Sequence, residues 1–263
     1  MNCKNCNNTL RASQKFCDEC GAKIIHNRLK PKVLAQQINE QFISIDNKFL
    51  RTFIDLFKQP ETVIIGYIEG TRKKYIDVLQ YFAIALTLAG IQVFLMTTFF
   101  KEALDFGSAF MEGFNSATSQ TKNPFADFNL DIFTKYQGLI YIISVPFSAL
   151  GTWLGYYLLG ERRYNFTEHL VINLYYSAQV IIVSAVLTIL FLVFGLDYLI
   201  VYSIITIPNF IYFFYVLKRI FKGPFWEAFT RFIFVMITYF ISFSIVGLIF
   251  FILGIIIAIM AHN

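Results

Sequence analysis

Five long apolar runs dominate the chain after residue 77. They cover residues 78–100, 138–160, 170–194, 198–217 and 232–260, and none of them contains Asp, Glu, Lys, Arg or His. About 20 helical residues, at 1.5 Å each, cross the roughly 30 Å hydrocarbon core of a bilayer. Each run reaches that length, so the pattern predicts an all-α integral membrane protein with a five-span membrane domain over residues 78–263.

The third and fourth runs are separated only by Gly195, Leu196 and Asp197. A connection this short predicts an antiparallel helical hairpin. The composition agrees with a membrane protein, because 57% of the residues are hydrophobic and only 15% are charged, against about 25% charged in soluble domains. An ordinary soluble domain, a disordered chain and a secreted disulfide-rich domain are therefore excluded.

Residues 26–77 have a different, amphipathic pattern and are expected to form a cytoplasmic juxtamembrane segment. Apolar residues recur near helical spacing at Val33, Leu34, Ile38, Phe42 and Ile45, and again at Phe49, Leu50, Phe53, Ile54 and Phe57, before Pro60. The pattern predicts two amphipathic helices. The second could lie among the inner headgroups or pack on the membrane domain as a surface helix. A basic and aromatic stretch, residues 70–75, is expected to anchor the first span at the interface.

Lys and Arg are distributed unequally between the two ends of the predicted spans. Residues 1–77 and the short loops 161–169 and 218–231 hold 19 of them, whereas the loop 101–137 holds three. By the positive-inside rule, we expect an inner-membrane protein with a cytoplasmic N-terminus and an external C-terminus.

All four cysteines lie in the first 20 residues, as Cys3, Cys6, Cys17 and Cys20. Two C-x-x-C turns supply four thiolates to a tetrahedral Zn²⁺. Gly21 after the second pair can adopt a left-handed conformation that turns backbone N–H groups toward the sulfurs, and Asn7 can do the same after the first. Disulfides or reactive thiols compete poorly, since the cytoplasm is reducing. We therefore predict a zinc ribbon over residues 1–25, with one structural zinc per chain.

The ribbon and its connector are basic, which permits several partners besides the lipid bilayer. Phosphates of nucleic acid or of an anionic inner leaflet would suit the charges. However, Phe16 is the only aromatic side chain for base stacking in residues 1–32, which makes nucleic acid unlikely. A cytoplasmic protein partner is the favoured expectation, and oligomers are compatible with the sequence.

Few large polar side chains lie within the predicted spans. They are Gln80, Gln92, Asn173, Gln179 and Asn209, together with two prolines, Pro146 and Pro208. Such amides usually cross-link helices. With kinks at the prolines, they could instead line a small polar cavity.

The loop before the third run contains Arg162, Arg163, Glu168 and His169. Thr167 is expected to be the N-cap of the third span, with Glu168 beside the positive helix end. A functional reading would pair Glu168 or His169 with the arginines to hold a lipid phosphate or an acidic group of a partner. No nucleophile, phosphate-loop or paired-carboxylate motif occurs, so no catalytic residue and no enzymatic activity is predicted.

Several motifs together resemble one family. They are residues 3–6, 16–23, 49–52 with 59–60, 70–75 and 166–171. The chain resembles uncharacterised bacterial membrane proteins, frequent in Bacteroidetes, that join an N-terminal zinc ribbon to a multi-span domain of unknown function. The resemblance implies zinc binding and an inner-membrane location, and it implies no activity.

The sequence therefore predicts a non-enzymatic inner-membrane protein whose cytoplasmic zinc ribbon is a docking or regulatory module. The alternative is a small-solute or lipid transporter or channel formed by the five helices.

Overall fold

The structure, a computed structural model, describes residues 2–11, 14–22, 24, 30–32, 48–101 and 134–262. The chain divides into two compact units, residues 1–47 and 48–263. The amphipathic helix expected over residues 33–45 lies outside the described residues, as does most of the loop 101–137.

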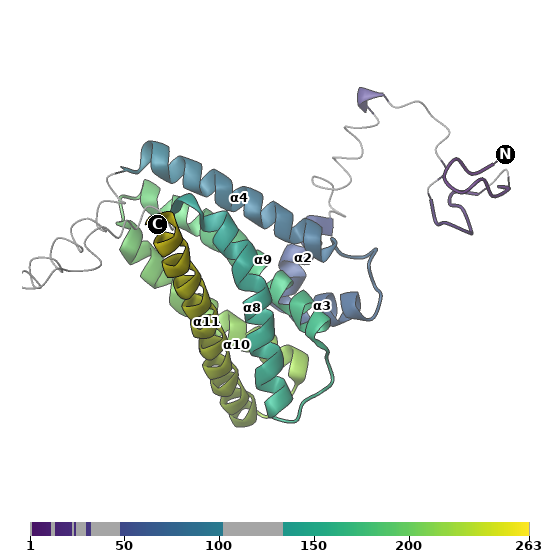
Figure 1. Cartoon of the computed structure of the whole chain (residues 1–263). Coiled ribbons are helices and arrows are strands. Elements are labelled where there is room, and N and C mark those ends of the chain that lie inside the picture. The colour runs from purple at the N-terminus through teal and green to yellow at the C-terminus, as the bar shows by residue number, and fades with distance from the viewer. Residues whose placement is uncertain are drawn as a thin grey trace, which may run out of the picture. The chain divides into compact units, whose positions relative to one another are not determined.

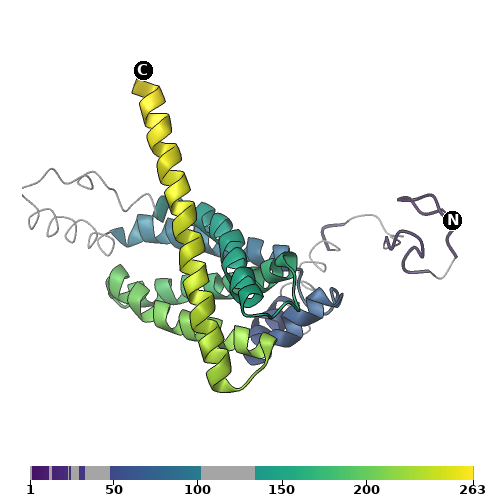
Figure 2. The ribbon, with the colours of Figure 1, turned by 60° about the horizontal axis from the view of Figure 1, so that its bottom comes forward.

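Helices make up the second unit (Figure 1). They are α2 (Lys48–Lys58), α3 (Pro60–Ile68), α4 (Val78–Phe99), α8 (Gln137–Leu158), α9 (Phe166–Val193), α10 (Tyr198–Phe221) and α11 (Phe225–His262). The described part of this unit contains no strand. In Figure 2 the C-terminal part of α11 continues beyond the ends of the other helices.

Among the described residues, five helices, α4 and α8 to α11, are long and apolar enough to cross a membrane, which confirms the predicted number. The apolar runs locate these helices well, but α9 begins four residues before its predicted span and α11 begins seven residues before. Both extensions carry charged residues, Glu168 in α9 and Glu227 and Arg231 in α11. A helix can continue past the hydrocarbon edge, so charge marks the end of an apolar run rather than the end of the helix.

Helix α9 is the centre of the described bundle. It packs against α4, α8 and α10 and also contacts α2 and α3, whereas α11 packs mainly on α8. Ala85 and Ala89 of α4 are buried, and so are Ala178 and Ala185 of α9. Small residues let neighbouring helices approach closely, which gives the dispersion contacts that hold membrane helices together.

Helices α8 and α11 meet at two glycines spaced four residues apart, Gly151 and Gly155. A Cβ on Gly151 would lie 2.6 Å from the Tyr239 Cα, and one on Gly155 would lie 2.7 Å from the Thr238 Oγ1. Thr238 Oγ1 in turn donates a hydrogen bond to the Gly151 carbonyl at 2.9 Å. The two helices are thus close enough that any side chain at Gly151 would collide with backbone.

Helix α2 packs on the bundle, and side chains of α9 and α10 donate hydrogen bonds to its backbone carbonyls. Gln179 of α9 donates to the Phe53 carbonyl at 3.2 Å, and Tyr212 of α10 donates to the Leu56 carbonyl at 3.0 Å. Leu56 lies in the last turn of α2, where carbonyls have no partner within the helix, so the bond from Tyr212 satisfies a group that would otherwise need water. Of the two alternatives for this segment, the structure favours packing on the helical unit.

The segment from Pro60 to Tyr75 differs from expectation. Residues 60–68 form a further helix, α3, which the sequence reading did not predict. Tyr75 was expected at the interface, but its side chain is buried and its hydroxyl donates to Asp55 Oδ2 at 2.9 Å. Burial raises the pKa of Tyr75, in keeping with a hydroxyl that stays protonated as a donor.

The N-cap of α9 is Asn165, so the prediction of Thr167 was wrong. The Asn165 side chain accepts the Glu168 backbone N–H at 3.0 Å, and Glu168 Oε2 accepts the Asn165 N–H at 2.7 Å. This reciprocal pair is a capping box, in which two N–H groups that lack helical partners are satisfied together. Glu168 does lie in the first turn of the helix, as expected.

Candidate metal centre

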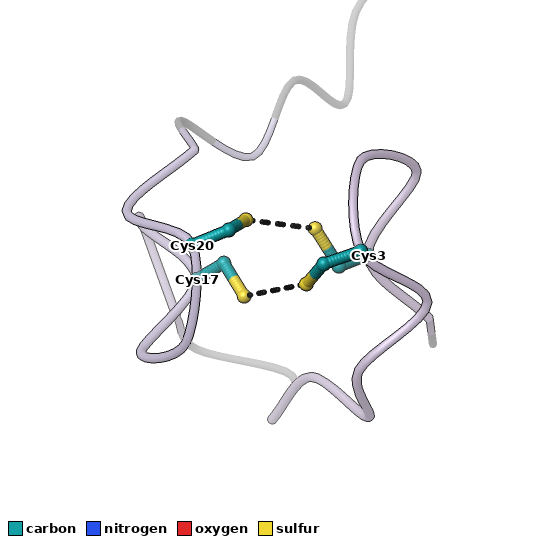
Figure 3. Close-up of side chains that lie close together, drawn as sticks. Cys3, Cys17 and Cys20 are labelled. Atoms are coloured by element: carbon teal, nitrogen blue, oxygen red, sulfur yellow. Dashed lines mark hydrogen bonds between the residues drawn. The ribbon is translucent and has the colours of Figure 1, made fainter.

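The four cysteines come together in the first unit. Their sulfurs all lie within 4.8 Å of one another, with Cys3 Sγ 3.7 Å from Cys20 Sγ and Cys6 Sγ 3.6 Å from Cys17 Sγ. Figure 3 shows Cys17 and Cys20 on one loop with their sulfurs turned toward the loop that carries Cys3. Four sulfurs held about 2.3 Å from one ion at tetrahedral angles would lie about 3.8 Å apart. The observed separations therefore fit a metal site of four sulfurs.

The two halves of this cluster repeat the same backbone turn. Cys3 donates its N–H to the Asn8 carbonyl at 2.8 Å, and Cys17 donates to the Ala22 carbonyl at 2.9 Å. Asn7 and Gly21 donate back to the carbonyls of Cys3 and Cys17 at 2.8 and 2.9 Å. Each loop thus closes on itself and fixes the direction of its two cysteine side chains.

Asn7 and Gly21 both have the left-handed backbone that the sequence reading gave them. Their φ angles are 61° and 68°. This conformation reverses the chain directly after each C-x-x-C pair, and Gly and Asn adopt it at the lowest cost. The two turns have the same shape, and in each of them the left-handed residue comes directly after the second cysteine of the pair.

Two of the thiols have pKa values shifted in opposite directions: at Cys6 the hydrogen bond from the Asn8 backbone is outweighed by the neighbouring sulfurs, which raise the pKa, whereas the surroundings of Cys20 favour its thiolate. The Asn5 side chain and the Ala22 backbone lower the pKa of the Cys20 thiol to about 6, since both stabilise the charged form. A thiolate is the form that binds a metal. No disulfide joins the four cysteines.

Little else in this unit could hold it folded. Cys3, Leu10 and Cys17 are its buried apolar residues among those that the structure describes, with Ala22 and Ile24 packed beside them. A core of this size cannot offset the conformational entropy of the loops. Metal binding would supply the missing free energy.

The loop before α9 does not form the anion site considered from the sequence. Glu168 is used in the capping box, and His169 is buried beneath it with Nδ1 3.2 Å from Thr152 Oγ1. Arg163 instead lies 4.0 Å from Glu161, and Arg162 lies over the Tyr157 ring. Among the described contacts, neither Glu168 nor His169 meets an arginine.

Two of the predicted polar residues cross-link helices. Asn173 Nδ2 donates to Thr152 Oγ1 at 2.9 Å, and its Oδ1 accepts from Ser148 at 2.5 Å, which joins α9 to α8. Gln179 accepts a hydrogen bond from Tyr81 of α4. Both amides are fully buried, and buried amides in apolar surroundings need such partners.

Two others, Gln92 and Asn209, line a cavity of about 280 Å³ between α4, α8, α9 and α10. The wall also contains the hydroxyls of Tyr141, Tyr176 and Tyr202, with further hydroxyl, amide and apolar side chains. Gln80 is exposed instead. The sequence could not tell which amides would cross-link and which would face a cavity.

The fold and the cluster together define a class: a chain with five helices able to span a membrane and an N-terminal four-cysteine group placed for a metal ion. Residues 46–90 match the model of a family of proteins of unknown function (DUF3667). The matched segment contains α2, α3 and the first part of α4. It therefore includes the two short helices that pack on the bundle and the start of the first long helix. No curated protein and no solved structure matches the chain.

Proposed function

We propose that this chain is a multi-pass protein of a bacterial inner membrane whose N-terminal unit binds one structural zinc ion and serves as a docking or regulatory module on the cytoplasmic face. The observation that carries the proposal is the group of four sulfurs within 4.8 Å of one another. Sulfur-only tetrahedral sites favour zinc, or iron in iron–sulfur chemistry. A zinc ion held by Cys3, Cys6, Cys17 and Cys20 has no open position for substrate, so its role is structural and not catalytic.

The cytoplasmic location rests on the distribution of basic residues. The N-terminal segment and the two short loops carry 19 Lys and Arg against three in the loop 101–137. The exposed residues of the first unit include Lys4, Arg11 and Lys15 as well as Asp18 and Glu19. A polar surface of mixed charge around a rigid metal-fixed core suits recognition of a protein partner.

The test is affinity capture of the full-length protein from detergent-solubilised membranes. The double variant Cys17→Ser/Cys20→Ser removes two of the four sulfurs, and we expect it to lose a specific protein partner while staying inserted. The matched control is Thr9→Ser, which changes an exposed uncharged residue of the same unit and keeps the metal. An unchanged partner set for an inserted cysteine variant would contradict the docking function.

A second candidate, a transporter or channel for a small solute or a lipid, is supported by the cavity of about 280 Å³ among the long helices, whose wall contains hydroxyl and amide groups. Polar cavities at membrane depth commonly mark a path or a binding site. Flux of small solutes or fluorescent lipids through proteoliposomes tests it. Rates equal to those of empty liposomes would remove this candidate and leave the docking function unaffected.

A further inference from the structure

The cavity between α4, α8, α9 and α10 lies in the half of the bundle away from α2 and α3. The hydrogen bonds to α2 come from Gln179 of α9 and Tyr212 of α10. The cavity wall continues from there along both helices, past Ser184 and Thr188 of α9 toward Tyr198 at the start of α10. In the proposed topology this half of the bundle faces the outer leaflet.

The lining is uncharged and mostly apolar, with separate hydrogen-bonding groups set into it. Tyrosine and threonine hydroxyls, one serine hydroxyl and three side-chain amides face the cavity, together with aliphatic and aromatic groups. No Asp, Glu, Lys, Arg or His is among the described residues of the wall. A charged group entering this site would lose its hydration without gaining a counter-ion, which is strongly unfavourable.

The side-chain amide of Gln92, in the cavity wall, has only a weak hydrogen-bond acceptor among its described contacts. Its side chain is 5% exposed, and its Nε2 donates to the Met96 sulfur at 3.4 Å. A thioether is a weak acceptor, so a buried amide donor is left with a poor partner. Across the cavity, Asn209 Nδ2 reaches Ser184 Oγ only at 3.3 Å. Both amides are therefore placed to bind an acceptor on a guest molecule more strongly than their present partners.

The mouth of the cavity is on the outer surface of α10. Two wall residues there are largely exposed, Tyr202 at 59% and Phe210 at 43%. On a helix long and apolar enough to span a membrane, that surface faces lipid. A guest can thus enter sideways from the bilayer. The volume of about 280 Å³ lies just below the usual range for small-molecule pockets, roughly 300–1,000 Å³, so it admits a headgroup and not a whole lipid.

We propose that this cavity binds the uncharged, hydrogen-bonding headgroup ring of a membrane amphiphile, whose chain stays in the bilayer beside Phe210. Gln92 and Asn209 donate to oxygens of the ring, and the tyrosines supply aromatic faces and hydroxyls. Two sources offer this chemistry, a neutral glycolipid with a sugar headgroup and a membrane quinone. This site would supply a binding step for the transporter candidate. It does not depend on that candidate, because a headgroup can be bound without being carried across the membrane.

The experiment uses the full-length protein in nanodiscs that contain monoglucosyl diacylglycerol, a short-chain benzoquinone and phosphatidylglycerol, with the bound molecules measured by native mass spectrometry. We expect retention of the sugar lipid or the quinone in preference to phosphatidylglycerol. Gln92→Leu should weaken retention about two- to tenfold, the range for one hydrogen bond. Gln80→Leu, the same change at an exposed position of α4, should not alter it.

A second variant keeps the test decisive if Gln92→Leu folds poorly. Thr206→Phe fills the cavity from α10 and should abolish retention, whereas Thr97→Phe, on an exposed part of α4, should not. Preference for phosphatidylglycerol would overturn the proposal. Retention that is the same in the wild type and Thr206→Phe would also overturn it, since the amphiphile would then bind elsewhere on the protein. Binding without flux in proteoliposomes would uphold the site and remove the transport function.

Discussion

Different interactions stabilise each of the two units of this chain. The first places four sulfurs around one point, and the buried apolar side chains among its described residues are Cys3, Leu10 and Cys17. In the second unit, long apolar helices pack around α9, and side chains of α9 and α10 hydrogen-bond to the backbone of α2. A unit without a hydrophobic core must obtain its stability from a bound ion, whereas helices in lipid obtain it from close packing. The two units should therefore fail under different treatments.

The largest expected effect is loss of the first unit when its metal is removed. Structural zinc contributes roughly 10–16 kcal/mol in small zinc-binding peptides at pH 7, far more than this small core can replace. We expect Cys3→Ser, or a strong chelator, to make the N-terminal segment fully sensitive to protease in the purified protein. The melting temperature of the helical unit should stay the same. Asp18→Ser is the control that keeps the metal, and a protease-resistant, metal-free Cys3→Ser protein would show that the core is sufficient.

The next effect concerns the contact between α8 and α11. Gly151→Val places a side chain where a Cβ already lies 2.6 Å from the Tyr239 Cα, so the helices must separate. Overpacking of this kind costs roughly 1–3 kcal/mol or more. Thermal unfolding in detergent should show a lower melting temperature with an unchanged metal content. Gly138→Val on the same helix meets nothing within 4 Å and is the control; equal effects of the two variants would contradict the described contact.

A smaller effect is expected where α10 holds α2. Tyr212→Phe removes the 3.0 Å hydrogen bond to the Leu56 carbonyl, and one such bond is worth about 1 kcal/mol. We expect a modest fall in melting temperature and faster hydrogen exchange in α2. Tyr157→Phe, at a side chain that is 42% exposed, should have almost no effect. Unchanged exchange in α2 would mean that the bond does not hold that helix.

The smallest expected effect is the pH dependence of the stability contributed by the ion pair between Glu61 of α3 and Arg219 of α10. Partial burial opposes ionisation of Glu61, but the two hydrogen bonds and the charge of Arg219 outweigh it and lower the Glu61 pKa below 4.5. Because the folded pKa lies below the unfolded one, the pair stabilises the protein above about pH 4.5. This stabilisation is lost as the pH falls through the lower folded value.

Its size is less than about 1 kcal/mol, since Arg219 is 42% exposed and water screens the pair. The measurement compares the melting temperatures of wild type and Glu61→Gln at pH 7 and near pH 4. Their difference should shrink at the lower pH. Glu69→Gln, at the exposed end of α3, is the control. A difference that grows on acidification would contradict the sign of the shift.

Much of the fold follows from local patterns in the sequence. An apolar run without charge has one stable form in a bilayer, so the number of long helices could be predicted. The cysteine cluster could be predicted because two short C-x-x-C turns each fix two sulfurs, and Asn7 and Gly21 confirm the expected turn. Such features are local, and their geometry does not depend on distant residues.

Other features were missed although a signal was present. Asn165 followed three residues later by Glu168 is the pattern of a capping box, and it would have placed the start of α9 correctly. Gly151 and Gly155 are spaced as small residues often are where membrane helices meet. In both places the apolar run itself is the more prominent pattern in the sequence.

The remaining features are set by tertiary contacts. Helix α3 has no clear amphipathic period, and it contains β-branched residues and Gly66, so propensity does not favour it. Asn173 and Asn209 are the same residue in similar apolar runs, yet the first is fully buried between two helices, whereas the second bonds Ser184 of the neighbouring helix and also lines the cavity. Only the rotation of each helix against its neighbours decides between those roles, and that rotation is not encoded locally.

The most direct test of the account is the metal content of the purified full-length protein, measured together with cysteine labelling from each side of the membrane. The account predicts about one zinc per chain and four thiols that react only from the cytoplasmic side, and only after chelation. Metal-free protein, or cysteines that react from the outside, would contradict both the metal unit and its proposed location.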